Sequence, residues 1–137
     1  MLAAGCGGGR LSHGDFVKRA DAVCSAYNAH VTPRVVTPHS YNAIERYVDS
    51  TLPLYTAALE KLSALDPPSS DAQAVRSWLA ADRRVARAVR ALGVAAQQRN
   101  FPAVSAAASR AQLAASESRQ AAAGLGMRVC GTLTKGV

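Results

Sequence analysis

Aromatic and acidic side chains are both scarce in this chain. Phe, Trp and Tyr together make up 5% of its 137 residues, although 49% of the residues are hydrophobic. A core with so few rings must be built mainly from Ala, Val and Leu, and that mixture favours closely packed helices. Asp and Glu number 9 against 16 Lys and Arg, which leaves a formal net charge of +7. This excess attracts the chain to anionic surfaces without specifying a partner.

Further absences exclude several kinds of function. No apolar run reaches the roughly 18 residues that a membrane-spanning helix needs. The sequence contains none of the Cys-x-x-Cys, Cys-x-x-Cys-His or Glu-x-x-His spacings that bind zinc, haem or di-iron centres. It also contains no Gly-x-Ser-x-Gly elbow, phosphate loop or dinucleotide fingerprint. We therefore expect a protein that is not an enzyme and that binds no metal and no cofactor.

The first residues resemble an export motif. Residues 2–6 read Leu-Ala-Ala-Gly-Cys and resemble the lipobox of bacterial lipoproteins, in which the signal peptidase cleaves before the cysteine. The resemblance implies that Cys6 carries a lipid. A signal peptide needs a longer leader than the residues before Cys6, so we expect the true start to lie upstream, with the lipobox region truncated here or the chain beginning at a misassigned codon. The alternative is a cytosolic protein with a disordered glycine-rich start.

The remaining chain divides into a tether and one helical domain. Glycine-rich residues 7–14, which include His13, predict a flexible tether, so residues 1–14 are separated from a domain over residues 15–137. Apolar residues then recur at intervals of three and four, the spacing of amphipathic helices. Asp15 or Ser12 can cap the first helix and Ser40 the second. The predicted helices cover residues 15–31, 41–65, 71–99 and 103–123.

These segments predict an all-α, up-and-down bundle of four or five helices. The count depends on Pro53, which should kink the second helix or divide it, with Ser50 and Thr51 satisfying the freed backbone groups. Pro102 suits the first turn of the last helix, and Gly124 and Gly126 should end it.

The cysteines predict a covalent link between the ends of this domain. If Cys6 carries a lipid, Cys24 and Cys130 remain as a pair, and in an exported protein a pair is most simply a disulfide. The alternative is two unrelated buried thiols. The segments around both cysteines, residues 15–24 and 125–131, resemble a loose group of small secreted or lipid-anchored helical proteins of high-GC actinobacteria. That resemblance implies an exported helical domain with paired cysteines and transfers no catalytic residue.

Two polar features stand out on the third predicted helix. Asp82 interrupts its apolar seam, and we interpret it as an edge residue paired with an arginine of a neighbouring helix, the alternative being a buried functional carboxylate. Four arginines share another face and form a candidate contact surface for anionic lipid or wall polymer, the alternative being an ordinary solvated face: Arg76, Arg83, Arg87 and Arg90. We do not expect nucleic acid as a partner, because aromatic residues for base stacking are few.

Together these features predict a non-enzymatic cell-envelope lipoprotein, anchored at the outer face of the membrane, that acts in interaction or scaffolding with an unidentified protein partner. An alternative is a small-ligand-binding module with an apolar groove, favoured if Tyr47, Tyr55 and Trp78 line a cavity. A weaker alternative is a cytosolic helical regulator that binds nucleic acid.

Overall fold

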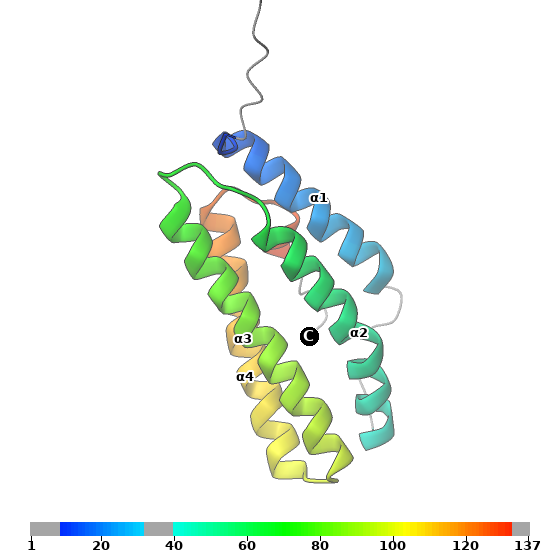
Figure 1. Cartoon of the computed structure of the whole chain (residues 1–137). Coiled ribbons are helices and arrows are strands. Elements are labelled where there is room, and N and C mark those ends of the chain that lie inside the picture. The colour runs from blue at the N-terminus through cyan, green and yellow to red at the C-terminus, as the bar shows by residue number, and fades with distance from the viewer. Residues whose placement is uncertain (1–8, 32–39, 133–137) are drawn as a thin grey trace, which may run out of the picture.

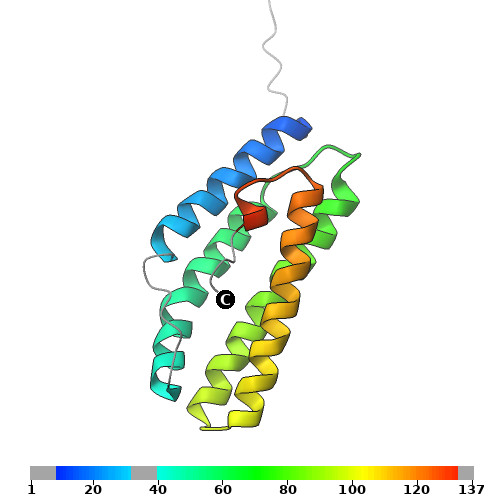
Figure 2. The same cartoon turned by 180° about the vertical axis from the view of Figure 1, so that it is seen from behind.

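The computed structural model describes residues 9–31 and 40–132, and these residues form an all-α fold without strands. Each helix packs against the one before it in the sequence, and a final 3-10 turn returns the chain to the first helix (Figure 1 and Figure 2). The predicted bundle is therefore confirmed. The elements are α1 (His13–Val31), α2 (Tyr41–Ser63), α3 (Ala72–Gln97), α4 (Phe101–Gly124) and the turn η2 (Cys130–Thr132).

Serine side chains start the first two helices. The hydroxyl of Ser40 accepts a hydrogen bond of 3.2 Å from the amide of Ala43 at the start of α2, as predicted. At the start of α1, Ser12 accepts a bond of 3.1 Å from the amide of Asp15. Ser12 is therefore the cap, and α1 begins two residues earlier than predicted. His13 accordingly lies in the first turn of α1 rather than in a tether.

The residues just before α1 are attached to the bundle. The amide of Leu11 donates a hydrogen bond of 2.9 Å to the carbonyl oxygen of Asp66, in the α2–α3 connection. The side chain of Leu11 also packs against the hydrophobic core. This attachment places the start of α1 beside the start of α3, where Nδ1 of His13 lies 2.6 Å from Oδ2 of Asp71.

Pro53 lies inside α2 without dividing it. The helix is continuous over Tyr41–Ser63, so the described part of the chain forms four α-helices rather than five. Figure 1 shows the axis of α2 changing direction about halfway along its length. Proline has no amide hydrogen, so the carbonyl of Asp49, four residues before Pro53, receives no helical hydrogen bond from it. Because Pro53 and Asp49 are both exposed, water can bond to this carbonyl instead. The hydroxyl of Ser50 bonds to the carbonyl of Tyr47 instead.

A residue with a left-handed backbone conformation follows the end of both α3 and α4. Gly126 has φ 86° and follows α4 in a Schellman motif, with the amides of Gly126 and Met127 donating to the carbonyls of Ala123 and Ala122. Glycine suits this position because it has no Cβ to clash. The same motif ends α3, but there the left-handed residue is Arg99, with φ 53°.

The bundle contains two main groups of buried side chains. The upper core surrounds Trp78, which is 1% exposed, and joins α1, the end of α2, the start of α3 and the end of α4. The lower core joins α2, α3 and α4 around Val48. Gly93 makes this lower contact possible, because a Cβ added there would lie only 2.9 Å from Cγ1 of Val48. Many of the other buried side chains are alanines, as the composition predicts.

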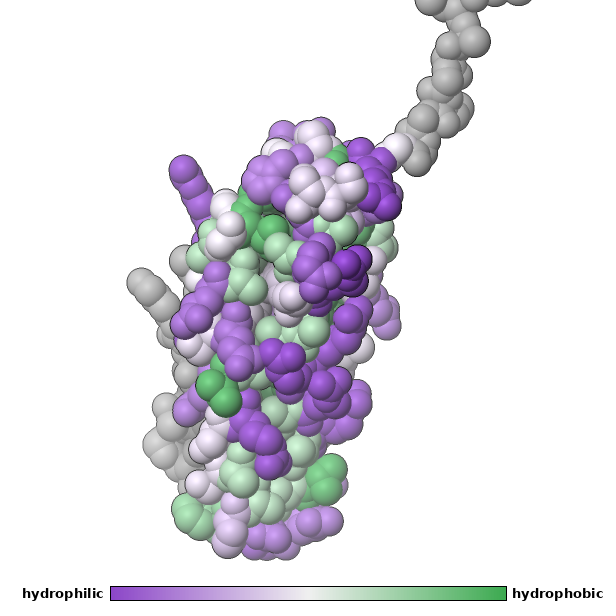
Figure 3. All heavy atoms as spheres, turned by 90° about the vertical axis from the view of Figure 1, so that its left-hand side faces the viewer, coloured by the Kyte–Doolittle hydropathy of each residue, from purple (hydrophilic) through white to green (hydrophobic). Residues whose placement is uncertain are grey.

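The surface formed by α3 and α4 mixes hydrophilic and mildly hydrophobic side chains. Figure 3, which views the molecule from that side, shows purple side chains alternating with light green ones, and strong hydrophobic colour only in isolated spots. The large apolar residues that are exposed on these helices are Val94, Phe101 and Leu113. Scattered exposed residues of this kind are normal in monomeric proteins.

Candidate functional site

Cys24 and Cys130 form the predicted disulfide. Their sulfurs are 2.08 Å apart and their Cα atoms 5.3 Å apart, although 106 positions separate them in the sequence. Cys24 lies on the buried face of α1, and Cys130 begins η2 after the end of α4. The bond therefore fastens the C-terminal segment to the first helix. Cys6 and the rest of the lipobox-like stretch lie outside the described residues.

Asp21 binds the same C-terminal segment through hydrogen bonds. One of its carboxylate oxygens, Oδ1, accepts from the amides of Val129 and Cys130, and Oδ2 accepts from the amide of Arg128, each at 3.0 Å. Asp21 lies one turn before Cys24 on α1. No pattern in the sequence assigns a role to Asp21, although residues 15–24 carry part of the resemblance to small exported helical proteins. Only the return of the chain from α4 to α1 reveals what the carboxylate binds.

Asp82 lies in the interior of the bundle and is 7% exposed. Its Oδ1 accepts hydrogen bonds from the hydroxyl of Tyr55 on α2, at 2.9 Å, and from the hydroxyl of Ser118 on α4, at 2.5 Å. The predicted partnership with an arginine of a neighbouring helix is therefore wrong. The seam spacing already placed Asp82 among buried positions, and two hydroxyl donors satisfy it there without a salt bridge.

The surroundings of Asp82 alter the protonation of several groups. Burial raises the pKa of Asp82 above its ordinary value, while hydrogen bonds from Ser118 and Tyr55 and the charge of Arg83 act in the opposite direction. Burial also raises the pKa of Tyr55, and the nearby Asp82 adds to this. The ring of Tyr27 on α1 packs edge-to-face against Tyr55, with centroids 5.6 Å apart, and burial raises its pKa as well.

This polar cluster ties three helices together through hydrogen bonds. Asp82 and its two hydroxyl donors come from α2, α3 and α4, so they fix the relative register of three helices. Within residues 9–31 and 40–132, no group of three or more His, Cys, Asp or Glu residues is placed to hold a metal ion. The hydroxyls can donate to the carboxylate or to a bound polar ligand, but the cluster contains no histidine or thiol.

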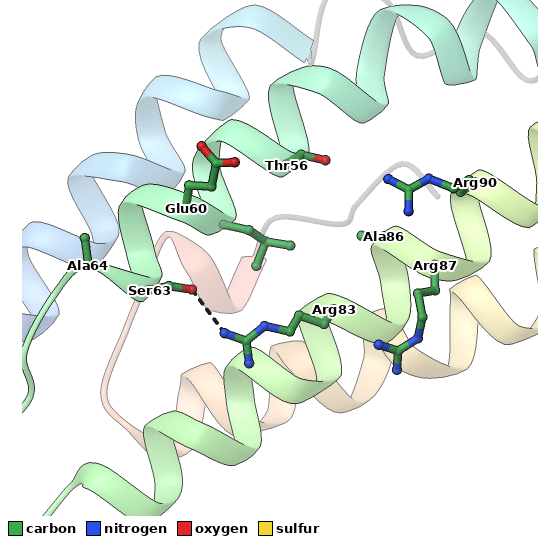
Figure 4. Close-up of a pocket in the computed structure, with 9 residues that line it drawn as sticks. Thr56, Glu60, Ser63, Ala64, Arg83, Ala86, Arg87 and Arg90 are labelled. Carbon is green, nitrogen blue, oxygen red and sulfur yellow. Dashed lines mark hydrogen bonds between the residues drawn. The ribbon is translucent and has the colours of Figure 1, made fainter.

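Three of the four candidate arginines line a groove between α2 and α3, which we call the arginine groove. Arg83, Arg87 and Arg90 lie along its α3 side, and the groove has a volume of about 540 Å³. Figure 4 shows Arg83 and Arg90 extending toward α2, with Arg83 bonded to the hydroxyl of Ser63 at 3.3 Å. The other lining residues are Thr56, Leu59, Glu60, Ser63, Ala64 and Ala86.

Arg76 and Arg84 do not belong to this groove. Arg76 lies in the first turns of α3 and donates to the side chain of Gln73 at 2.7 Å. Arg84 lies on the opposite side of α3, where it forms an ion pair of 2.5 Å with Glu117 of α4. The sequence spacing placed four arginines on one stripe of α3. Because α2 packs beside only the C-terminal part of that stripe, three of them line the groove and Arg76 does not.

The aromatic residues proposed to line an apolar ligand cavity are separated from one another. Trp78 is enclosed in the upper core, with Tyr55 packed against that core. Tyr47 packs against the lower core instead. The three rings therefore fill the bundle at two levels rather than converging on one site.

Comparison of the chain with protein-family models, curated proteins and solved structures gives no match. Among the described residues, no helix is both long enough and apolar enough to cross a membrane. The chain is a small helical protein with a disulfide, and disulfides are typical of extracytoplasmic proteins.

Proposed function

We propose that this chain is a non-enzymatic lipoprotein of the cell envelope, held at the outer face of the membrane by a lipid on Cys6, where its helical bundle acts as an interaction module. The observation that carries the proposal is the disulfide between Cys24 and Cys130. Disulfides form and persist in oxidising compartments and are rare in the cytosol.

Cys6, the cysteine outside the disulfide, also supports the proposal. With Cys24 and Cys130 engaged, Cys6 is the one cysteine of the three left for another role. It follows the residues that resemble a lipobox and precedes three glycines. A flexible glycine spacer suits an anchor that must hold a folded domain near a membrane without restricting its orientation.

The interaction role is supported by the distribution of charge. The chain has a net charge of +7, and the arginine groove concentrates three exposed guanidinium groups on one side of the bundle. Membrane leaflets that contain anionic lipid attract such cationic surfaces. A domain held close to the membrane would meet anionic lipid continuously.

Mass spectrometry of the protein from its native host tests the anchor. Trypsin cleaves after Arg10, so a lipidated mature protein yields a fragment of residues 6–10 that carries a diacylglyceryl group on the thiol of Cys6. A Cys6→Ala variant provides the control and should appear in the soluble fraction. An unmodified fragment with residues 1–5 still attached contradicts the proposal.

A further inference from the structure

The cations of the arginine groove have no acidic partners among the described residues. The ion pairs of the described residues involve Arg10, Arg84, Arg99 and His13. None of them involves Arg83, Arg87 or Arg90. Glu60 is the one acid in the lining. Figure 4 shows its carboxylate on the α2 side, turned away from the arginines. The groove therefore keeps an unneutralised positive charge.

The floor of the groove is apolar. Leu59 of α2 is 9% exposed, and Ala86 of α3 is half-buried, so both present hydrocarbon surface between the two helices. The hydroxyls of Thr56 and Ser63 add hydrogen-bonding groups on the side opposite the arginines (Figure 4). A ligand that fits this lining must combine an anionic group with an apolar part.

We propose that the arginine groove binds one anionic phospholipid, with the phosphate on Arg83 and Arg90 and the adjoining apolar part of the lipid over Leu59 and Ala86. Guanidinium groups bind phosphate oxygens through paired, charge-assisted hydrogen bonds. Arg87 lies between the other two on the rim and adds charge. The volume of about 540 Å³ suits a headgroup and its first carbons, because small-molecule sites range from roughly 300 to 1,000 Å³.

A wall polymer or an acidic peptide fits this lining less well. A polyanion that is polar along its whole length leaves the floor formed by Leu59 and Ala86 uncovered. It also needs a longer track of cations, whereas Arg76 lies outside the groove and bonds to Gln73. The short groove and its apolar floor favour a single amphiphilic anion.

This inference rests on the proposed function, because a lipid anchor on Cys6 keeps the groove close to the phospholipid surface and raises its effective concentration there. The two can nevertheless fail separately. Lipidation of Cys6 is read from the native protein, whereas lipid binding is measured on unlipidated protein with vesicles.

The experiment uses the full chain with Cys6→Ser, to prevent lipidation and intermolecular disulfides, and measures cosedimentation with vesicles of phosphatidylglycerol and phosphatidylcholine. We compare Arg83→Gln/Arg90→Gln with the control Arg76→Gln/Arg110→Gln, which removes the same charge from exposed positions outside the groove. The groove variant should bind at least about tenfold more weakly than the control variant, because Arg83 and Arg90 would contact the phosphate directly whereas Arg76 and Arg110 contribute only net charge. Circular dichroism should show both variants folded.

Competition identifies the ligand class. Short-chain phosphatidylglycerol should displace the protein from the vesicles at lower concentration than glycerol 3-phosphate, which lacks the apolar part. Equal weakening of the two double variants overturns the proposal, because net charge alone would then explain binding. Equal competition by glycerol 3-phosphate, polyphosphate or a poly-glutamate peptide also overturns it and assigns the groove to a general anion or an acidic chain.

Discussion

The backbone amide of Cys130 donates a hydrogen bond of 3.0 Å to Oδ1 of Asp21, across 109 positions of sequence. Three residues after Asp21, on the next turn of α1, Cys24 is bonded covalently to the same Cys130. The C-terminal segment is therefore held to one turn of α1 by both hydrogen bonds and a disulfide. The hydrogen bonds orient the backbone of η2, and the disulfide prevents its separation from α1.

Replacement of Asp21 by Ala should lower the free energy of unfolding by about 2 kcal/mol, because three backbone amides lose a charged acceptor. Urea denaturation with the disulfide intact measures this loss. Asp49→Ala removes an exposed carboxylate from α2 and serves as the control, with an expected change within about 0.5 kcal/mol. Equal stability of the two variants would show that the carboxylate of Asp21 does not hold η2.

Loss of the disulfide should destabilise the fold by up to about 4.7 kcal/mol, the chain-entropy value for a loop of about 100 residues. We expect Cys24→Ser/Cys130→Ser and the chemically reduced wild-type protein to unfold at similar urea concentrations. Thiol counting in denaturant without reductant should find both cysteines blocked in the untreated protein. Two reactive thiols at these positions would contradict the bond and remove the main support for export.

The Asp82→Asn variant should become more stable relative to the wild type as the pH rises. Burial raises the pKa of Asp82 in the folded protein above its ordinary 3.8, so the folded state holds its proton more tightly than the unfolded state. The stability that protonated Asp82 contributes to the wild type is fully present below the pKa of the unfolded state, and it is lost as the pH rises through the pKa of Asp82 in the folded protein. Asparagine keeps an oxygen that can accept from Tyr55 and Ser118 but does not ionise.

Urea denaturation of both proteins over a pH series measures this difference. In a Ser118→Ala background the loss should extend to higher pH, because the hydrogen bond from Ser118 lowers the pKa of Asp82. A stability difference between Asp82→Asn and the wild type that is independent of pH would refute the argument.

Alanine at Gly93 should destabilise the protein although alanine is the better helix former by up to about 1 kcal/mol. The new Cβ would lie 2.9 Å from Cγ1 of Val48, in a buried contact between α2 and α3. Such overpacking costs about 1 to 3 kcal/mol. Thermal denaturation measures the change.

Gly124→Ala is the matched control for Gly93→Ala, because Gly124 is the last residue of α4 and an added Cβ would meet nothing within 4 Å. This control should be neutral or slightly stabilising. In addition, Val48→Ala should partly offset the effect of Gly93→Ala, since the two side chains compete for one space. Strict additivity of the two changes would exclude the steric explanation.

The amino-acid sequence by itself determined the class of fold and placed the helix boundaries to within two residues. Intervals of three and four between apolar residues depend only on helix geometry, and Ser40, Pro102 and Gly126 act through their own local chemistry. The pairing of Cys24 with Cys130 was also predictable, because it follows from the number of cysteines once the lipobox-like residues assign Cys6 another role. The same local signals misplaced the start of α1, since Ser12 and Asp15 are both competent caps.

Only the tertiary structure decided which polar residues meet. Asp82 binds Tyr55 and Ser118 because α2, α3 and α4 converge on it, and no spacing within α3 encodes that convergence. The role of Asp21 likewise depends on where the chain returns after α4. The arginine groove exists because α2 packs beside Arg83, Arg87 and Arg90 and leaves Arg76 outside. Contacts between distant residues depend on how whole helices pack, which the pattern within a single helix does not contain.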